Sequence, residues 1–189
     1  MHKLALAFGA IVLTGALAAA CSAPARARTS APGSAAVHGT ANIMLYSINS
    51  DGPDFRAVVS GVIGDYGPAV TVYPDGKVDP EHNSEMELDL THGSFRLSIE
   101  QLDKKFVEAA SREPVYPRTC SDHFDFSVGV PIVPGSGTGA YQGITGHFSI
   151  TVTADEVAVR PCSAQSQFLW QVIVVAGQGS VSALQRQAV

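Results

Sequence analysis

The sequence is poor in basic residues and lacks the common catalytic signatures. Only 12 of its 189 residues are Lys or Arg, against 17 Asp or Glu, which gives a net charge of −5. This balance disfavours nucleic acid as a partner, because proteins that bind it present positively charged surfaces. The chain contains no G-x-S-x-G nucleophile elbow and no H-E-x-x-H zinc helix. Non-enzymatic roles therefore rank first, and we expect no cofactor.

Patterns of metal ligands are incomplete as well. Cys120 and His123 are potential zinc ligands, but no second pair of ligands with matching spacing follows them. From Asp79 to Glu85 every second residue carries a side-chain oxygen, as in a calcium loop, yet Ser84 stands where that loop needs glycine. A solvated acidic loop is the favoured interpretation, and we expect no metal site.

The N-terminal apolar segment, residues 4–20, is short for a membrane-spanning helix. It follows Lys3 and ends in three alanines, which is typical of a secretory signal peptide over residues 1–20. Cys21 comes next, in a context that resembles a bacterial lipobox. We therefore expect Cys21 to be lipidated and to anchor the protein to the outer face of the cell membrane. The alternative is cleavage at the alanines without lipidation, which would give a secreted protein.

Cysteine is scarce, and its count is odd. If Cys21 carries lipid, Cys120 and Cys162 remain as a pair in an oxidising compartment, where disulfides persist. A disulfide between them would close a loop of about forty residues and stabilise the fold by roughly 3–4 kcal/mol. Two buried free thiols are the alternative.

Residues 21–36 are rich in Ala, Ser and Pro and have little to bury, so we expect a flexible tether there. The rest predicts a single domain over residues 37–184, followed by a short tail at residues 185–189.

Period-two alternation of apolar and polar residues dominates the predicted domain. From Ser84 to Leu90, and again from Phe95 to Glu100, apolar residues occupy alternate positions, as in half-buried antiparallel strands. A tight turn at residues 92–93 would join these two strands and pair Leu90 with Phe95. Further strands are predicted at 38–48, 55–63, 70–73, 124–130, 146–152 and 168–175, with turns at 51–54, 65–68 and 74–76.

One helix is predicted, over Glu100–Glu113, where apolar residues recur at helical spacing. About eight strands and one short helix indicate a mainly β fold. We favour an antiparallel β-barrel, because closure removes exposed edges, and keep a β-sandwich as the alternative.

The most distinctive stretch, Gly137 to Gly146, reads GTGAYQGITG. A dinucleotide fingerprint needs a helix after it, whereas a strand is predicted here. The stretch resembles the G-T-G-x-[FY]-x-G-x-x-G segment of plant dirigent proteins and allene oxide cyclases, and one in uncharacterised secreted bacterial proteins. This resemblance implies a β-barrel in which the segment is an architectural hairpin, with its aromatic residue packed inward. The residues concerned are Gly137, Gly139, Tyr141, Gly143 and Gly146.

Three classes of function fit these observations. The first is a cell-envelope lipoprotein whose interior binds a small hydrophobic ligand or lipid. The second is an enzyme of the cyclase or dirigent type, and the third is a structural or protein-binding lipoprotein with a filled core. Ligand binding predicts an apolar cavity of roughly 300 Å³ or more, and an enzyme needs convergent ionisable groups with shifted pKa values besides. We favour ligand binding.

Overall fold

The structure, a computed structural model, describes residues 35–48, 55–79, 84–111, 116–162 and 168–185. The predicted signal peptide, Cys21, the tether up to residue 34 and the predicted turn at 51–54 lie outside the described residues. The first strand begins at Ala35 and the last ends at Gln185. Strand pairing thus extends slightly beyond both ends of the predicted domain.

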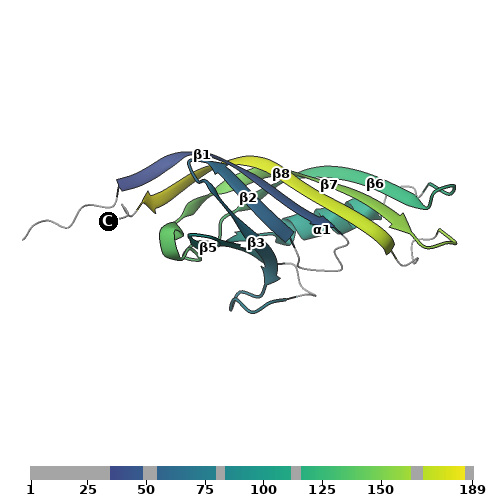
Figure 1. The fold of residues 1–189 in the computed structure, drawn as a ribbon, viewed down its shortest axis with the longest axis horizontal. Helices are drawn as coiled ribbons and strands as arrows, with labels where there is room; N and C mark the ends of the chain where they lie inside the picture. The colour runs from purple at the N-terminus through teal and green to yellow at the C-terminus, as the bar shows by residue number, and fades with distance from the viewer. Residues whose placement is uncertain (1–34, 49–54, 80–83, 112–115, 163–167, 186–189) are drawn as a thin grey trace, which may run out of the picture. The chain divides into compact units, whose positions relative to one another are not determined.

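The described residues form eight strands and one α-helix, arranged as one curled antiparallel sheet (Figure 1). The sheet order is β5-β4-β3-β2-β1-β8-β7-β6. The mainly β class and the single helix are confirmed. The elements are β1 (Ala35–Ile48), β2 (Phe55–Gly61), β3 (Asp65–Val72), β4 (Glu85–Leu90), β5 (Gly93–Ser98), α1 (Glu100–Ala110), β6 (Ser121–Pro131), the 3-10 helix η1 (Gly139–Tyr141), β7 (Thr145–Ala158) and β8 (Phe168–Gln185).

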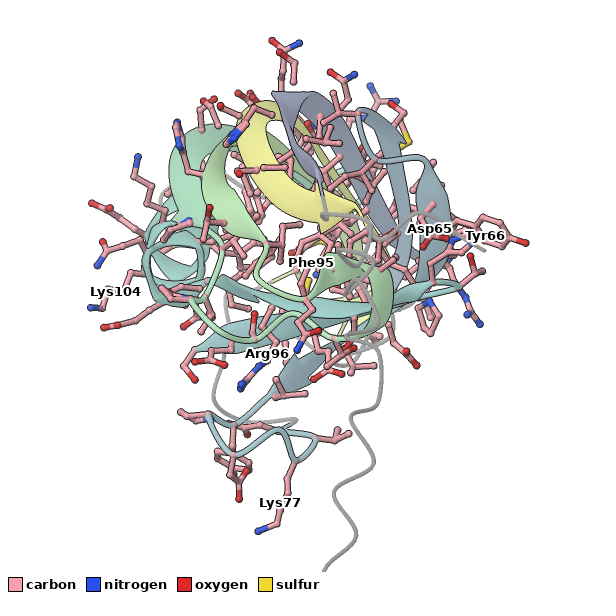
Figure 2. All side chains as sticks on the ribbon, turned by 90° about the vertical axis from the view of Figure 1, so that its left-hand side faces the viewer. Asp65, Tyr66, Lys77, Phe95, Arg96 and Lys104 are labelled. Carbon is pink, nitrogen blue, oxygen red and sulfur yellow. A yellow bond between two sulfur atoms is a disulfide. The ribbon has the colours of Figure 1, made fainter. Side chains whose placement is uncertain are left out.

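Alternation along the strands gives the sheet one buried face. In β1, Ile43 and Leu45 are buried, whereas Met44 and Tyr46 are exposed on the opposite face. Burying the apolar face is the main driving force for this arrangement, because each large apolar side chain contributes roughly 1.5–3 kcal/mol when it leaves water. In Figure 2, Phe95 lies within the curve of the sheet.

The β4–β5 hairpin forms as predicted, but its register differs by two residues. The turn consists of Thr91 and His92, so Phe95 faces Leu88 instead of Leu90. Because side chains alternate with a period of two, this shift keeps every apolar side chain on the expected face.

The predicted turn at residues 65–68 is wrong, because these residues begin β3 and the chain turns earlier, at 62–64. The reason is the buried Asp65 carboxylate. It accepts hydrogen bonds from the backbone N–H groups of Thr91 (3.2 Å) and His92 (3.0 Å). These bonds hold the start of β3 in the sheet and also fix the β4–β5 turn at these two residues.

The apolar run 168–175 predicts that Trp170 lies in the core, but Trp170 is 44% exposed. The segment 168–175 is apolar on both faces, so its periodicity could not select the buried one. Alternation within residues 86–99, 124–128 and 148–152 predicts one inward-facing wall, and every member is buried except Phe126, which is half-buried. The buried members are Met86, Leu88, Leu90, Phe95, Leu97, Ile99, Phe124, Val128, Phe148, Ile150 and Val152.

The helix α1 begins at Glu100 as predicted and ends at Ala110, before the predicted Glu113. It presents Leu102 and Phe106, four residues apart, to the buried face of the sheet. Phe106 packs edge-to-face on Phe124 of β6, with ring centroids 5.1 Å apart.

The chain after β6 runs along the free edge of β5. The Val133 N–H donates to the carbonyl of Arg96 (2.8 Å), and the Thr138 N–H donates to that of Ser94 (2.8 Å). This segment, residues 132–140, satisfies backbone groups that an open edge strand would leave exposed.

Candidate functional site

An apolar cavity of about 260 Å³ lies between the buried face of the sheet and α1. From the sheet, Ile43, Leu97 and Val175 face it, and from the helix Leu102 and Phe106 do. Its volume is that of roughly nine water molecules in the liquid, so it can hold a small organic molecule. The volume lies just below the 300 Å³ expected from the sequence.

The helix covers this cavity as a roof. None of its residues is fully buried, and its apolar contacts come from one side only. Lys105 Nζ donates to the Ser127 carbonyl of β6 (2.8 Å) and thereby fastens the roof beside the cavity. A helix held by one apolar face and a few polar contacts is among the less stable parts of a fold, and local opening would admit a ligand.

Three polar side chains also line the cavity: Thr71, Asp103 and Gln171. The Thr71 hydroxyl donates to the Asp79 carbonyl (2.5 Å), so it is engaged within the protein. Gln171 Nε2 donates to a carboxylate oxygen of Glu156, the residue opposite it on β7. The cavity therefore has an amide and a carboxylate on its wall and a second carboxyl group behind the amide.

Glu156 is buried and sits opposite Asp122 of β6. Burial raises the pKa of Glu156, the hydrogen bond from Gln171 opposes this, and the nearby charge of Asp122 raises the pKa further. One oxygen of Asp122, Oδ1, is buried with no hydrogen-bond partner among the described residues. Acceptor oxygens thus accumulate at this end of the interior.

The glycine segment lies away from the cavity and positions Tyr141, which is buried. The Tyr141 hydroxyl donates to Asp65 Oδ2 (2.6 Å), and its ring packs edge-to-face on Phe95. Asp65 also accepts from the backbone of Thr91 and His92 and from the Thr91 hydroxyl. We call these four residues, Asp65, Thr91, His92 and Tyr141, the clasp.

The hydrogen bonds of the clasp keep Asp65 ionised and Tyr141 protonated. Burial alone would raise the pKa of Asp65, but the hydrogen bonds from Thr91, Tyr141, Tyr66 and His92 outweigh burial and hold the pKa far below its ordinary range. Burial, together with the hydrogen bond to the Asp65 charge, raises the pKa of Tyr141 above its ordinary value. A carboxylate so fully engaged is a poor proton acceptor, so the clasp serves the architecture.

Close backbone approach explains why glycine occupies position 139. Gly139 has φ +55°, and a Cβ there would lie 2.4 Å from the His92 carbonyl oxygen. The other glycines of the stretch are placed around it: Gly137 precedes η1, Gly143 follows it, and Gly146 lies in β7.

Cys120 and Cys162 come together as a disulfide, with Cα atoms 5.1 Å apart. The bond joins the start of β6 to the connection between β7 and β8. Among the described residues no group of three His, Cys, Asp or Glu could hold a metal ion. Of the acidic stretch considered as a calcium loop, residues 80–83 lie outside the described part.

Sequence reasoning found the sheet side of the cavity and missed most of its roof and polar wall. Met86, Leu97, Ile99, Ile150 and Val152 belong to the predicted interior wall and line it. The helical spacing of Leu102 and Phe106 was a usable signal for the roof. The sequence did not predict that Gln171 lines the cavity, because an isolated polar residue in an apolar strand indicates neither the face on which it lies nor its partner.

Comparison with known proteins gives no further guide. No family model, no curated protein and no solved structure matches the chain. In the part of the chain that the structure describes, no helix is both long and apolar enough to span a bilayer.

Proposed function

We propose that this protein is an exported, lipid-anchored binding protein that holds a small hydrophobic ligand in the cavity beneath α1. The cavity of about 260 Å³ carries the proposal, because its lining is mainly apolar and a helix covers it. Pockets of this kind, with a few polar groups on an apolar wall, are where proteins bind small molecules. An enzyme of the cyclase or dirigent type, or a protein-binding lipoprotein, remains the alternative.

We also propose that the curled sheet is a β-barrel rather than half of a sandwich. The contacts of residues 132–140 with the edge of β5 support this, as does the isolated bridge between Leu97 and Ile132. The resemblance of the glycine stretch to dirigent proteins and allene oxide cyclases points to the same architecture.

Filling the cavity tests ligand binding. Val175 is buried and lines the cavity, so Val175→Phe should weaken binding of the neutral fluorophore N-phenyl-1-naphthylamine by about tenfold or more. The matched control is Val174→Phe on the opposite face of β8, which should bind the fluorophore as the wild type does. Fluorescence titration gives both affinities, and thermal melting checks the folding of each variant.

A filled core would give another result. There, Val175→Phe would overpack the interior and cost about 1–3 kcal/mol of stability, and the wild type would not bind the fluorophore. That outcome rejects ligand binding and favours the protein-binding role.

The anchor is tested separately at Cys21. We expect intact-mass analysis of membrane-extracted protein to show a lipidated mature N-terminus at this residue. Cys21→Ala should move the protein from the membrane fraction to the soluble fraction, whereas the neighbouring control Ser22→Ala should not. Unmodified Cys21, or retention of Met1, would refute the anchor.

A further inference from the structure

The chemistry of the cavity wall restricts the ligand further, given the proposed function on which this step depends. Among the described residues that line the cavity, none is Lys, Arg or His. The polar groups there are the Asp103 carboxylate, the Gln171 amide and the Thr71 hydroxyl. An anionic ligand group would find no cation on this wall, and it would be repelled by the carboxylate.

The nearest lysines of the roof are engaged elsewhere. Lys104 Nζ is 2.7 Å from Glu100 Oε1 in an exposed pair along the helix, and Lys105 Nζ donates to the Ser127 carbonyl. Arg96, on β5, pairs with Glu85 (2.6 Å). Bringing any of these three side chains to an anion in the cavity would require breaking its contact.

Two further carboxyl groups, those of Glu156 and Asp122, follow Gln171 across the neighbouring strands β7 and β6. The Gln171 amide N–H group is directed to Glu156, and Asp122 beyond keeps one buried oxygen without a hydrogen-bond partner among the described residues. Glu156 and Asp122 do not line the cavity, whereas the Asp103 carboxylate does, and as a hydrogen-bond acceptor it favours a ligand that donates.

From this geometry we infer that the cavity selects amphiphiles with an uncharged or cationic, hydrogen-bond-donating head, such as aliphatic alcohols and amines, and rejects aliphatic acids. Asp103 is the specificity-determining residue, because it places a carboxylate on the helical wall of the cavity. Specificity here rests on repulsion of the wrong head group as much as on attraction of the right one.

Displacement of N-phenyl-1-naphthylamine from the full-length protein by octanol, octylamine and octanoate at pH 7 tests the inference. Octanol and octylamine should compete, and octanoate should be weaker by about tenfold or more. Equal competition by all three, or competition by none while the fluorophore binds, overturns the inference and leaves the proposed function standing. If the fluorophore itself does not bind, the proposed function fails and the inference falls with it.

A charge-removing variant assigns the effect to its residue. Asp103→Asn should narrow the difference in affinity between octanol and octanoate (the gap) by several-fold. Asp125→Asn removes the same charge from the exposed side of β6 and should leave the gap as it is. If both variants change the gap equally, net charge and not the cavity wall sets the selectivity, and the assignment to Asp103 is wrong.

Discussion

The clasp and the cavity lie along the same strand, β8, and are built in opposite ways. Near Val181 the strand passes Tyr141, whose hydroxyl meets a carboxylate that several donors saturate. Near Val175 it passes an apolar space that side chains do not fill. The clasp determines where strands begin and turn, and it leaves no capacity for a ligand. The cavity gives up packing energy, which is why it is the part that can bind something.

The strongest test of this comparison removes the centre of the clasp. Asp65→Ala leaves the Tyr141 hydroxyl and the Thr91 and His92 N–H groups without their acceptor, and we expect a loss of about 3–5 kcal/mol of unfolding free energy. The control Asp89→Ala truncates an exposed aspartate on β4 and should change stability by less than about 0.5 kcal/mol. Urea denaturation measures both, and equal losses would show that the clasp is not special.

A second test separates two costs of replacing a glycine: the clash of the added Cβ with a neighbouring backbone, and the strain of a positive φ. Gly139→Ala meets the His92 carbonyl and has positive φ, so we expect a loss of about 2–3 kcal/mol. Gly135 also has positive φ (+76°), but a Cβ there would meet no atom within 4 Å. Gly135→Ala should therefore cost only the conformational part, about 1–2 kcal/mol. Ligand binding at the cavity should persist in both variants while they are folded; its selective loss in Gly139→Ala would mean that the segment is a site and not a scaffold.

The pH dependence of stability should have opposite signs in the two regions, and this is the smallest effect. The folded-state pKa of Asp65 lies below its ordinary value of 3.8, so its contribution is present above that pH and is lost as pH falls. The folded-state pKa of Glu156 lies above its ordinary value of 4.5, so its contribution is present below that pH and is lost as pH rises.

Accordingly, the stability deficit of Asp65→Asn should grow as pH rises from 3 to 6, whereas Glu156→Gln should gain on the wild type as pH rises from 4 to 7. Urea unfolding at each pH gives the two profiles, with Asp125→Asn as a control that follows the wild type. Profiles of the same sign would contradict the contrast between the two regions.

Alternation in the sequence was enough to place most of the core. The runs around Leu88 and Leu97 predicted both the strands and their buried face, because burying the other face would have buried charged residues. The exact register escaped prediction, since it depends on the contact of Asp65 with the β4–β5 turn, 26 residues away along the chain. Asp65 itself was misread, because Asp, Gly and Pro together are typical of a turn, and only burial shows that this carboxylate belongs to a strand.

The sequence by itself determined the strand content, the single helix and most of the buried face, and it favoured a pairing of Cys120 with Cys162. These follow from local periodicity and from counting, which need no knowledge of distant contacts. The tertiary structure alone decided that Trp170 faces outward, that Tyr141 closes on Asp65, and that Gln171 and Asp103 share the wall of one cavity. Each of these depends on which strands become neighbours and how far the sheet curls, and contacts between residues far apart in the chain set both.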